Sequence, residues 1–157
     1  MKHRYWLVLV LAIVMGIAST AWTQGTGRVI RASAFILEDD RGRPRGGLRI
    51  TEEKPGLFLL DENGKEHVSL FMNKDGPMLQ LYDGNDRTRV LLNVFKDKPT
   101  LAVLDENGQT CVWLSVTENG PELIFLNNKS GAWLVVNEVG PALTMYDKNG
   151  KRIWEAP

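Results

Sequence analysis

A segment of 22 residues recurs along this chain, and its leucines keep the same place in each copy. Leu57, Leu79 and Leu101 stand 22 residues apart, and each opens a short apolar run that ends at an aspartate. A fixed period of about 20 to 50 residues is typical of repeat proteins. The repeat therefore predicts a fold in which strands and turns build an extended surface, whereas chemistry needs a unique cluster of reactive groups.

Each copy predicts two β-strands joined by a tight turn. One strand follows a proline and runs to the aspartate, and the other runs through segments such as 68–72, 90–94 and 112–116. The turn between them reads Asp-Glu-Asn-Gly at residues 61–64. Asn and Gly tolerate positive φ there, and the Asp carboxylate can accept hydrogen bonds from nearby backbone amides. A proline at the start of a strand breaks no ladder, and we find no helical period after residue 22.

The period-two alternation assigns the apolar side chains to one face. We predict that Leu59 pairs with Val68, and that Val68 pairs across the next turn with Leu81. A slip of one residue would turn every side chain to the opposite face, so a uniformly apolar face supports this register. We expect this face to be shielded as the core. Its predicted members are Phe35, Leu37, Leu48, Ile50, Leu57, Leu59, Val68, Leu70, Met72, Leu79, Leu81, Val90, Leu92, Val94, Leu101, Val103, Val112, Leu114, Val116, Leu123, Phe125, Leu134, Val136, Leu143, Met145 and Ile153.

The predicted fold class is all-β, an antiparallel up-and-down meander of about 11–12 short strands. The last copy supports this prediction, because Leu143 follows Leu123 by only 20 residues. Loss of two residues from an antiparallel loop preserves the alternation. The meander would form a curved sheet or a barrel, and the alternative is a two-sided β-solenoid with one coil per repeat. An arginine- and glycine-rich first hairpin at residues 43–47 blunts an edge and favours an open sheet.

The N-terminus reads as an export signal. The basic residues 2–4 precede an uncharged stretch from Tyr5 to Ala18, and small residues follow at 19–21. We therefore predict a signal peptide or N-terminal membrane anchor helix at residues 1–21, a linker at 22–28 and a β-repeat domain at 29–157. Cleaved or not, the segment places the domain outside the cytoplasm, because basic residues stay inside. The predicted location is periplasmic or extracellular, with membrane contact only through the N-terminal segment.

Charge and residue counts argue against several function classes. The formal net charge is +0, with 19 basic and 19 acidic residues, which gives no support for nucleic-acid binding. Cys111 is the only cysteine, and His67 is the only histidine outside the leader, so neither has a partner for a metal site. The Asp-Asn turns lack the further acidic residue that a calcium cage needs. We predict no catalytic residue, no metal and no cofactor.

The other face of the predicted sheet becomes more apolar along the chain. Early copies place Ser69 and Gln80 on it, whereas later copies place Trp113 and Trp133 there. We predict a contact surface made of Trp113, Trp133 and Trp154, on an exported non-enzymatic module for protein interaction or self-association at the cell envelope. The alternative is a carbohydrate-binding module in which these tryptophans stack on sugar rings. A structural role, with the tryptophans packed under a loop or against Trp154, explains them as well.

A family resemblance rests on three segments. They are the Asp-Glu-Asn-Gly-Lys turn at 61–65, the Gly-Pro-x-Leu-x-Leu strand at 76–81 and the opening pattern Val-Ile-Arg-Ala-x-x-Phe-x-Leu-x-Asp at 29–39. In these segments the chain resembles a group of uncharacterised bacterial exported repeat proteins, a resemblance that implies export and the repeat class. The hairpin spacing is also similar to that of MORN and YD repeats. The chain has Tyr-Asp pairs at 82–83 and 146–147 but lacks the paired Gly and aromatic signature of MORN.

Overall fold

The computed structural model describes residues 29–52 and 54–157, and its sheet occupies the unit Ser33–Pro157. The predicted signal or anchor segment at 1–21 and the linker at 22–28 lie outside the described residues. In the part of the chain that is described, no helix is long and apolar enough to cross a membrane.

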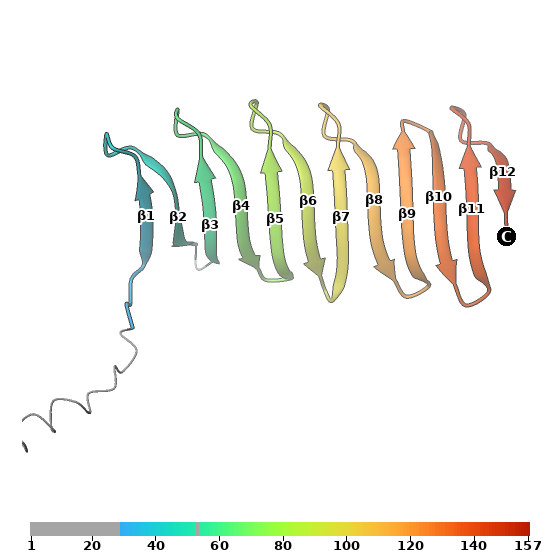
Figure 1. Cartoon of the computed structure of the whole chain (residues 1–157). Coiled ribbons are helices and arrows are strands. Elements are labelled where there is room, and N and C mark those ends of the chain that lie inside the picture. The colour runs from blue at the N-terminus through green and yellow to red at the C-terminus, as the bar shows by residue number, and fades with distance from the viewer. Residues whose placement is uncertain (1–28, 53) are drawn as a thin grey trace, which may run out of the picture. The chain divides into compact units, whose positions relative to one another are not determined.

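Twelve strands form one antiparallel sheet, in which each strand lies beside the next one in the chain (Figure 1). Turns alternate between the two ends of the strands, so the sheet is an up-and-down meander. The order β1 to β12 leaves β1 and β12 as free edges, which makes the sheet open rather than closed. The strands are β1 (Ala34–Glu38), β2 (Pro44–Thr51), β3 (Lys54–Leu60), β4 (Glu66–Asn73), β5 (Gly76–Tyr82), β6 (Thr88–Phe95), β7 (Lys98–Leu104), β8 (Thr110–Thr117), β9 (Gly120–Asn127), β10 (Ser130–Asn137), β11 (Gly140–Tyr146) and β12 (Arg152–Ala156).

The register confirms the predicted pairing. Leu59 pairs with Val68, and Val68 pairs with Leu81. In the shortened fifth copy Asn127 pairs directly with Ser130, so the loss of two residues shortens the turn and keeps the faces. The meander is therefore the observed fold, and the solenoid alternative is wrong.

One row of side chains crosses the whole sheet. It begins at Phe35 on β1, and each member pairs with the next across a strand boundary. Every member from β2 to β11 is a leucine. The row continues through Leu48, Leu57, Leu70, Leu79, Leu92, Leu101, Leu114, Leu123, Leu134 and Leu143. We call the side of the sheet that carries this row the leucine face, and the opposite side the second face.

The expectation that the leucine face is shielded is wrong for the single sheet. Phe125, on this face, keeps 50% of its surface exposed, and Leu59 and Val103 are exposed as well. The buried apolar side chains, Phe58 and Ala102, both lie on the second face. The physical reason is that the chain folds into one layer, so within the described residues no second layer lies opposite the leucines. Alternation predicts which side chains share a face, but it does not predict what packs against that face.

The last strand corrects the predicted face of Ile153. Met145 pairs with Trp154, the same offset that joins Leu59 to Val68, so Ile153 does not lie on the leucine face as predicted. The register shifts between Met145 and Tyr146, and the same kind of shift occurs beside the Asp turns of the hairpins β3–β4, β5–β6 and β7–β8. A β-bulge of this kind adds one residue to one strand of a pair. Ile153 is therefore the bulged residue, and Trp154 takes its place on the leucine face.

The turns at the proline edge depend on glycine for two reasons. Gly120 and Gly140 occupy equivalent turns and have φ angles of 117° and 137°, in the region that side chains rarely adopt. A Cβ on Gly120 would also lie 2.0 Å from the carbonyl oxygen of Val136, whereas a Cβ on Gly140 would meet nothing within 4 Å. Because of this neighbouring strand, the requirement for glycine is stronger at position 120 than at position 140.

We predict that Gly120→Ala destabilises the sheet more than Gly140→Ala. Both variants carry the backbone strain of a positive φ, which costs about 1–3 kcal/mol. Only Gly120→Ala must also move β9 away from β10, and this should at least double the loss of unfolding free energy. Denaturant unfolding followed by circular dichroism measures both losses at one protein concentration. Equal losses would contradict the close packing of the two strands.

Candidate binding surfaces on the two faces of the sheet

The leucine face carries three parallel rows of uncharged residues. Beside the central leucine row, a second row runs from β1 to β12, and a third row alternates an apolar side chain with a proline. The second row is Leu37, Gly46, Leu59, Val68, Leu81, Val90, Val103, Val112, Phe125, Ala132, Met145 and Trp154. The third row is Ile50, Pro55, Met72, Pro77, Val94, Pro99, Val116, Pro121, Val136 and Pro141. These rows form a continuous apolar surface without a charge.

The second face is mixed and better packed. Its central row runs Ile36, Gly47, Phe58, Ser69, Gln80, Leu91, Ala102, Trp113, Ile124, Trp133, Thr144 and Glu155. The guanidinium carbon of Arg49 lies 4.1 Å from the centre of the Phe58 ring, and this contact covers the ring. The core of the single layer is therefore this row, and not the leucines.

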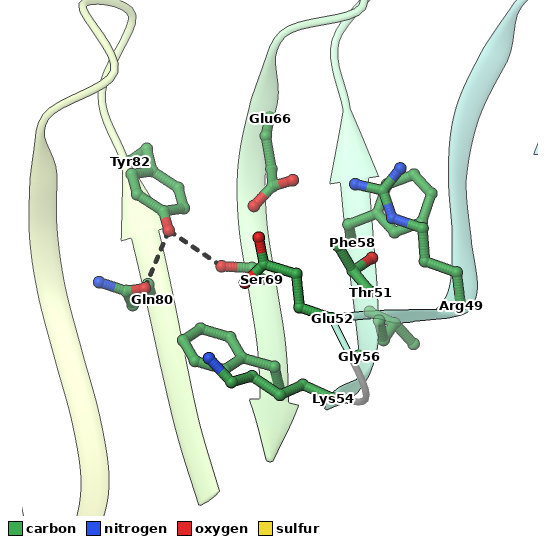
Figure 2. A pocket seen from close by; sticks show the side chains of 12 residues that line it. Arg49, Thr51, Glu52, Lys54, Gly56, Phe58, Glu66, Ser69, Gln80 and Tyr82 are labelled. Atoms are coloured by element: carbon green, nitrogen blue, oxygen red, sulfur yellow. Dashed lines mark hydrogen bonds between the residues drawn. The ribbon is translucent and has the colours of Figure 1, made fainter. Parts of the chain in front are cut away.

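A hollow of about 300 Å³ lies on the second face over β2 to β5. Figure 2 shows Tyr82 above Ser69 and Gln80, with Arg49 stacked against Phe58 on the far side. The Tyr82 hydroxyl lies 3.0 Å from the Ser69 hydroxyl and donates to Gln80 Oε1 at 2.9 Å. Neither a histidine nor a carboxylate is hydrogen-bonded to Ser69 in the described part of the chain. The hydroxyls of Tyr82 and Ser69 thus form a hydrogen-bond network with Gln80.

Two of the three predicted surface tryptophans share a face. Trp113 and Trp133 lie in one row, with Ile124 paired to both. The indole of Trp113 is half-buried and donates to Ser115 Oγ at 3.0 Å. Trp133 is 39% exposed and lines an apolar hollow of about 210 Å³ with Tyr146. Trp154 lies on the leucine face, so its predicted place beside the other two is wrong.

The Asp turns use their carboxylates to close the backbone. In the turn after β3, Asp61 Oδ1 accepts from the amides of Asn63 at 2.8 Å and Lys65 at 2.9 Å. The same two bonds recur at each of the other Asp turns, so the predicted turn chemistry is confirmed. Backbone hydrogen bonds are the main cause that lowers the pKa of four of these groups. The four are Asp39, Asp61, Asp83 and Asp105.

His67 and Cys111 have local partners. His67 Nε2 lies 3.4 Å from Asp61 Oδ2, and Nδ1 lies 3.2 Å from the carbonyl oxygen of Tyr82. Cys111 is half-buried, with its Sγ 3.7 Å from the carbonyl oxygen of Gln109. Among the described residues, no group of three His, Cys, Asp or Glu side chains could hold a metal ion. These polar groups serve the turns and bulges of the sheet.

Sequence reasoning missed the polar networks of the second face. Ser69 pairs with Gln80, and Ser115 pairs with Glu122, whose Oε1 accepts from the Ser115 hydroxyl at 2.7 Å. The signal was available, because the register that pairs the leucines also pairs these polar residues. The hydrogen bond between Tyr82 and Ser69 depends on a side-chain rotamer, so the alternation of the sequence could not predict it.

No protein-family model matches this chain, and no curated protein matches it. The two faces of the sheet are therefore the features of this chain that can indicate a function.

We predict that the sheet loses stability in acid. A carboxyl whose pKa is lower in the folded than in the unfolded chain stabilises the fold above its unfolded pKa, and that stability is lost as the pH falls through the folded pKa. With an unfolded Asp pKa of about 3.9, the thermal midpoint should fall as the pH is lowered from about 4 toward 2. Asp105→Asn should make this fall shallower, whereas Glu106→Gln, which changes an exposed acid of the same turn, should not. Circular dichroism melts check this, and identical pH profiles of Asp105→Asn and the unaltered chain would contradict it.

Proposed function

We propose that this chain is an exported, non-enzymatic β-repeat module that mediates protein interaction or assembly at the cell envelope. The open leucine face is the observation that carries the proposal. Twelve strands about 4.8 Å apart and three rows about 6.8 Å apart give this face an area of roughly 1,100 Å². The largest apolar patch on a typical monomer measures only about 300–600 Å², and larger ones mark interaction sites.

The arrangement of the polar groups supports a non-enzymatic role. The hydroxyl of Ser69 bonds to Tyr82, and the carboxylate of Asp61 bonds to two backbone amides of its own turn. A general acid or base needs a free site for a substrate proton within hydrogen-bond reach. Ser69 and Asp61 are instead engaged in the network of the second face and in a turn.

The cellular location is proposed from the sequence. The basic residues 2–4 and the apolar stretch after them are typical of an export signal or anchor. The resemblance to exported bacterial repeat proteins supports the same location, as a periplasmic or extracellular domain. The membrane would be reached only through the N-terminal segment.

Carbohydrate binding is the second candidate, and the surroundings of Trp133 favour it. The exposed indole of Trp133 lies beside Tyr146 along an apolar hollow on the second face. Aromatic side chains that combine an apolar ring with a polar tip suit a carbohydrate ligand. This site is on the opposite side of the sheet from the leucine face, so both roles are compatible.

A photoreactive residue in place of Leu92 tests the interaction function. Leu92 is exposed on the leucine face, and Asn107, in an Asp turn, serves as the matched control position. On irradiation of cells of the source organism, we expect a protein adduct from position 92 and none from position 107. The adduct is read by gel mobility and mass spectrometry. If position 92 gives no protein adduct, the interaction function is wrong.

Tryptophan fluorescence tests the carbohydrate alternative. Soluble cell-wall fragments should quench the unaltered chain, and Trp133→Ala should abolish this quenching. Trp154→Ala, a change of an exposed tryptophan on the leucine face, should retain it. Unchanged emission with every fragment would remove the carbohydrate role and leave the interaction function untouched.

A further inference from the structure

We infer that a second copy of this chain covers the leucine face, so that two sheets pack face to face as a two-layer β-sandwich. The inference rests on the proposed interaction function, because it names the partner. The experiments below separate the failure of one from the failure of the other.

The single layer lacks a sufficient core. Its buried apolar side chains are Phe58 and Ala102, and both lie on the second face. Stable domains bury an apolar sheet face against another layer, and here no second layer is present within residues 33–52 and 54–157. A cover is therefore needed for folding itself. A second copy is present whenever the chain is made.

The leucine face is large enough for a second sheet of the same size to pack against it. The leucine face offers roughly 1,100 Å² per copy on the spacings of a β-sheet, and a stable interface needs about 800 Å² per partner. The apolar N-terminal stretch is too small to replace a second sheet. Even the whole run of 18 uncharged residues from Tyr5 to Trp22 would cover only about 300 Å², whether it were extended or helical.

The face is complementary to itself. A two-fold interface brings the same patch of both copies together, and the central row presents leucine on every strand from β2 to β11. No charge in the three rows opposes this contact. Sandwiched sheets lie about 10 Å apart with their strands aligned within about 30°, a geometry that suits interdigitating leucines.

Side-chain size in the second row fits one orientation of the two-fold axis. An axis parallel to the strands through the middle of the sheet places β2 over β11 and β3 over β10. Gly46 of one copy then faces Met145 of the other, and Leu59 faces Ala132. In these two pairs a large side chain meets a small one, whereas at the two ends of the row Leu37 of one copy faces Trp154 of the other. Alternation of large and small residues across facing layers is the arrangement that fills a sandwich without voids.

A lipid surface suits this face less well. The free edges of β1 and β12 carry unpaired backbone groups, and hydrocarbon offers no hydrogen bonds to them. In the sandwich these edges stay in water, where their backbone groups are hydrated.

Light scattering on the full chain in detergent-free buffer tests the inference with a matched pair of variants. Leu134 and Trp133 are neighbours on β10, are 40% and 39% exposed, and lie on opposite faces. The unaltered chain should have twice the mass of one chain. Leu134→Lys should reduce the mass to that of one chain, and Trp133→Lys should leave it doubled. A monomeric or polydisperse unaltered chain would overturn the inference, as would a dimer that persists in folded Leu134→Lys.

Methionine oxidation tests the same point without any substitution, so it does not depend on how the variants fold. Met72 lies on the leucine face and is 48% exposed in the single sheet, whereas Met78 lies half-buried on the second face. In the sandwich, peroxide should oxidise Met72 more slowly than Met78, and dilution below the dissociation constant should remove this protection of Met72. Faster oxidation of Met72 at every concentration would overturn the second-copy cover.

Different outcomes would contradict the interaction function and the second copy as its partner. A cross-linked adduct of Leu92 with a different protein would overturn the second copy as partner and leave the interaction function in place. A monomer that binds lipid vesicles through its leucine face and forms no protein adduct would overturn both. An adduct of twice the chain's mass supports both.

Discussion

Cross-strand pairing of equivalent leucines is the constraint on which this structure depends. Each Asp turn and each proline turn returns the chain at a register that sets leucine opposite leucine, as in the pairs Leu92–Leu101 and Leu101–Leu114. Side chains alternate between the two faces along a strand, so one correct pair fixes the face of every side chain in that strand. The repeat sets the same pair in each successive strand, across all twelve strands of the sheet. The bulge beside the Asp turns belongs to the same rule, since it recurs at equivalent positions of successive hairpins.

The same regularity makes the two faces differ in composition. Repetition makes the leucine face uniform and uncharged, which suits a broad contact and offers no unique pocket. On the second face the copies diverge, so Ser69, Trp113 and Trp133 occupy equivalent places in one row with different partners. The proposed assembly therefore uses the uniform leucine face, and the proposed carbohydrate site uses the varied second face. A repeat protein can in this way keep one face for its architecture while the other varies.

Much of the fold was predictable because it follows from local rules. Period two and the length of the turns yielded the pairing of Leu59 with Val68, and the shortened loop at Asn127 kept the faces as expected. The burial of the leucines was not predictable, because alternation says which side chains share a face and nothing about what lies opposite. Trp154 was misplaced because Ile153 was assigned to the leucine face, although the offset that joins Leu59 to Val68 joins Met145 to Trp154. The Tyr82–Ser69 bond escaped prediction because it depends on rotamers across two strands.

Backbone proton contacts in solution test the central claim most directly. The meander predicts nuclear Overhauser effects between the backbones of Leu92 and Leu101, whose Cα atoms are partners and so lie about 4.5–5.5 Å apart. It predicts none between Leu79 and Leu101, which are separated by β6. A contact between Leu79 and Leu101 without one between Leu92 and Leu101 would mean that whole repeats stack on one another, and would contradict this account.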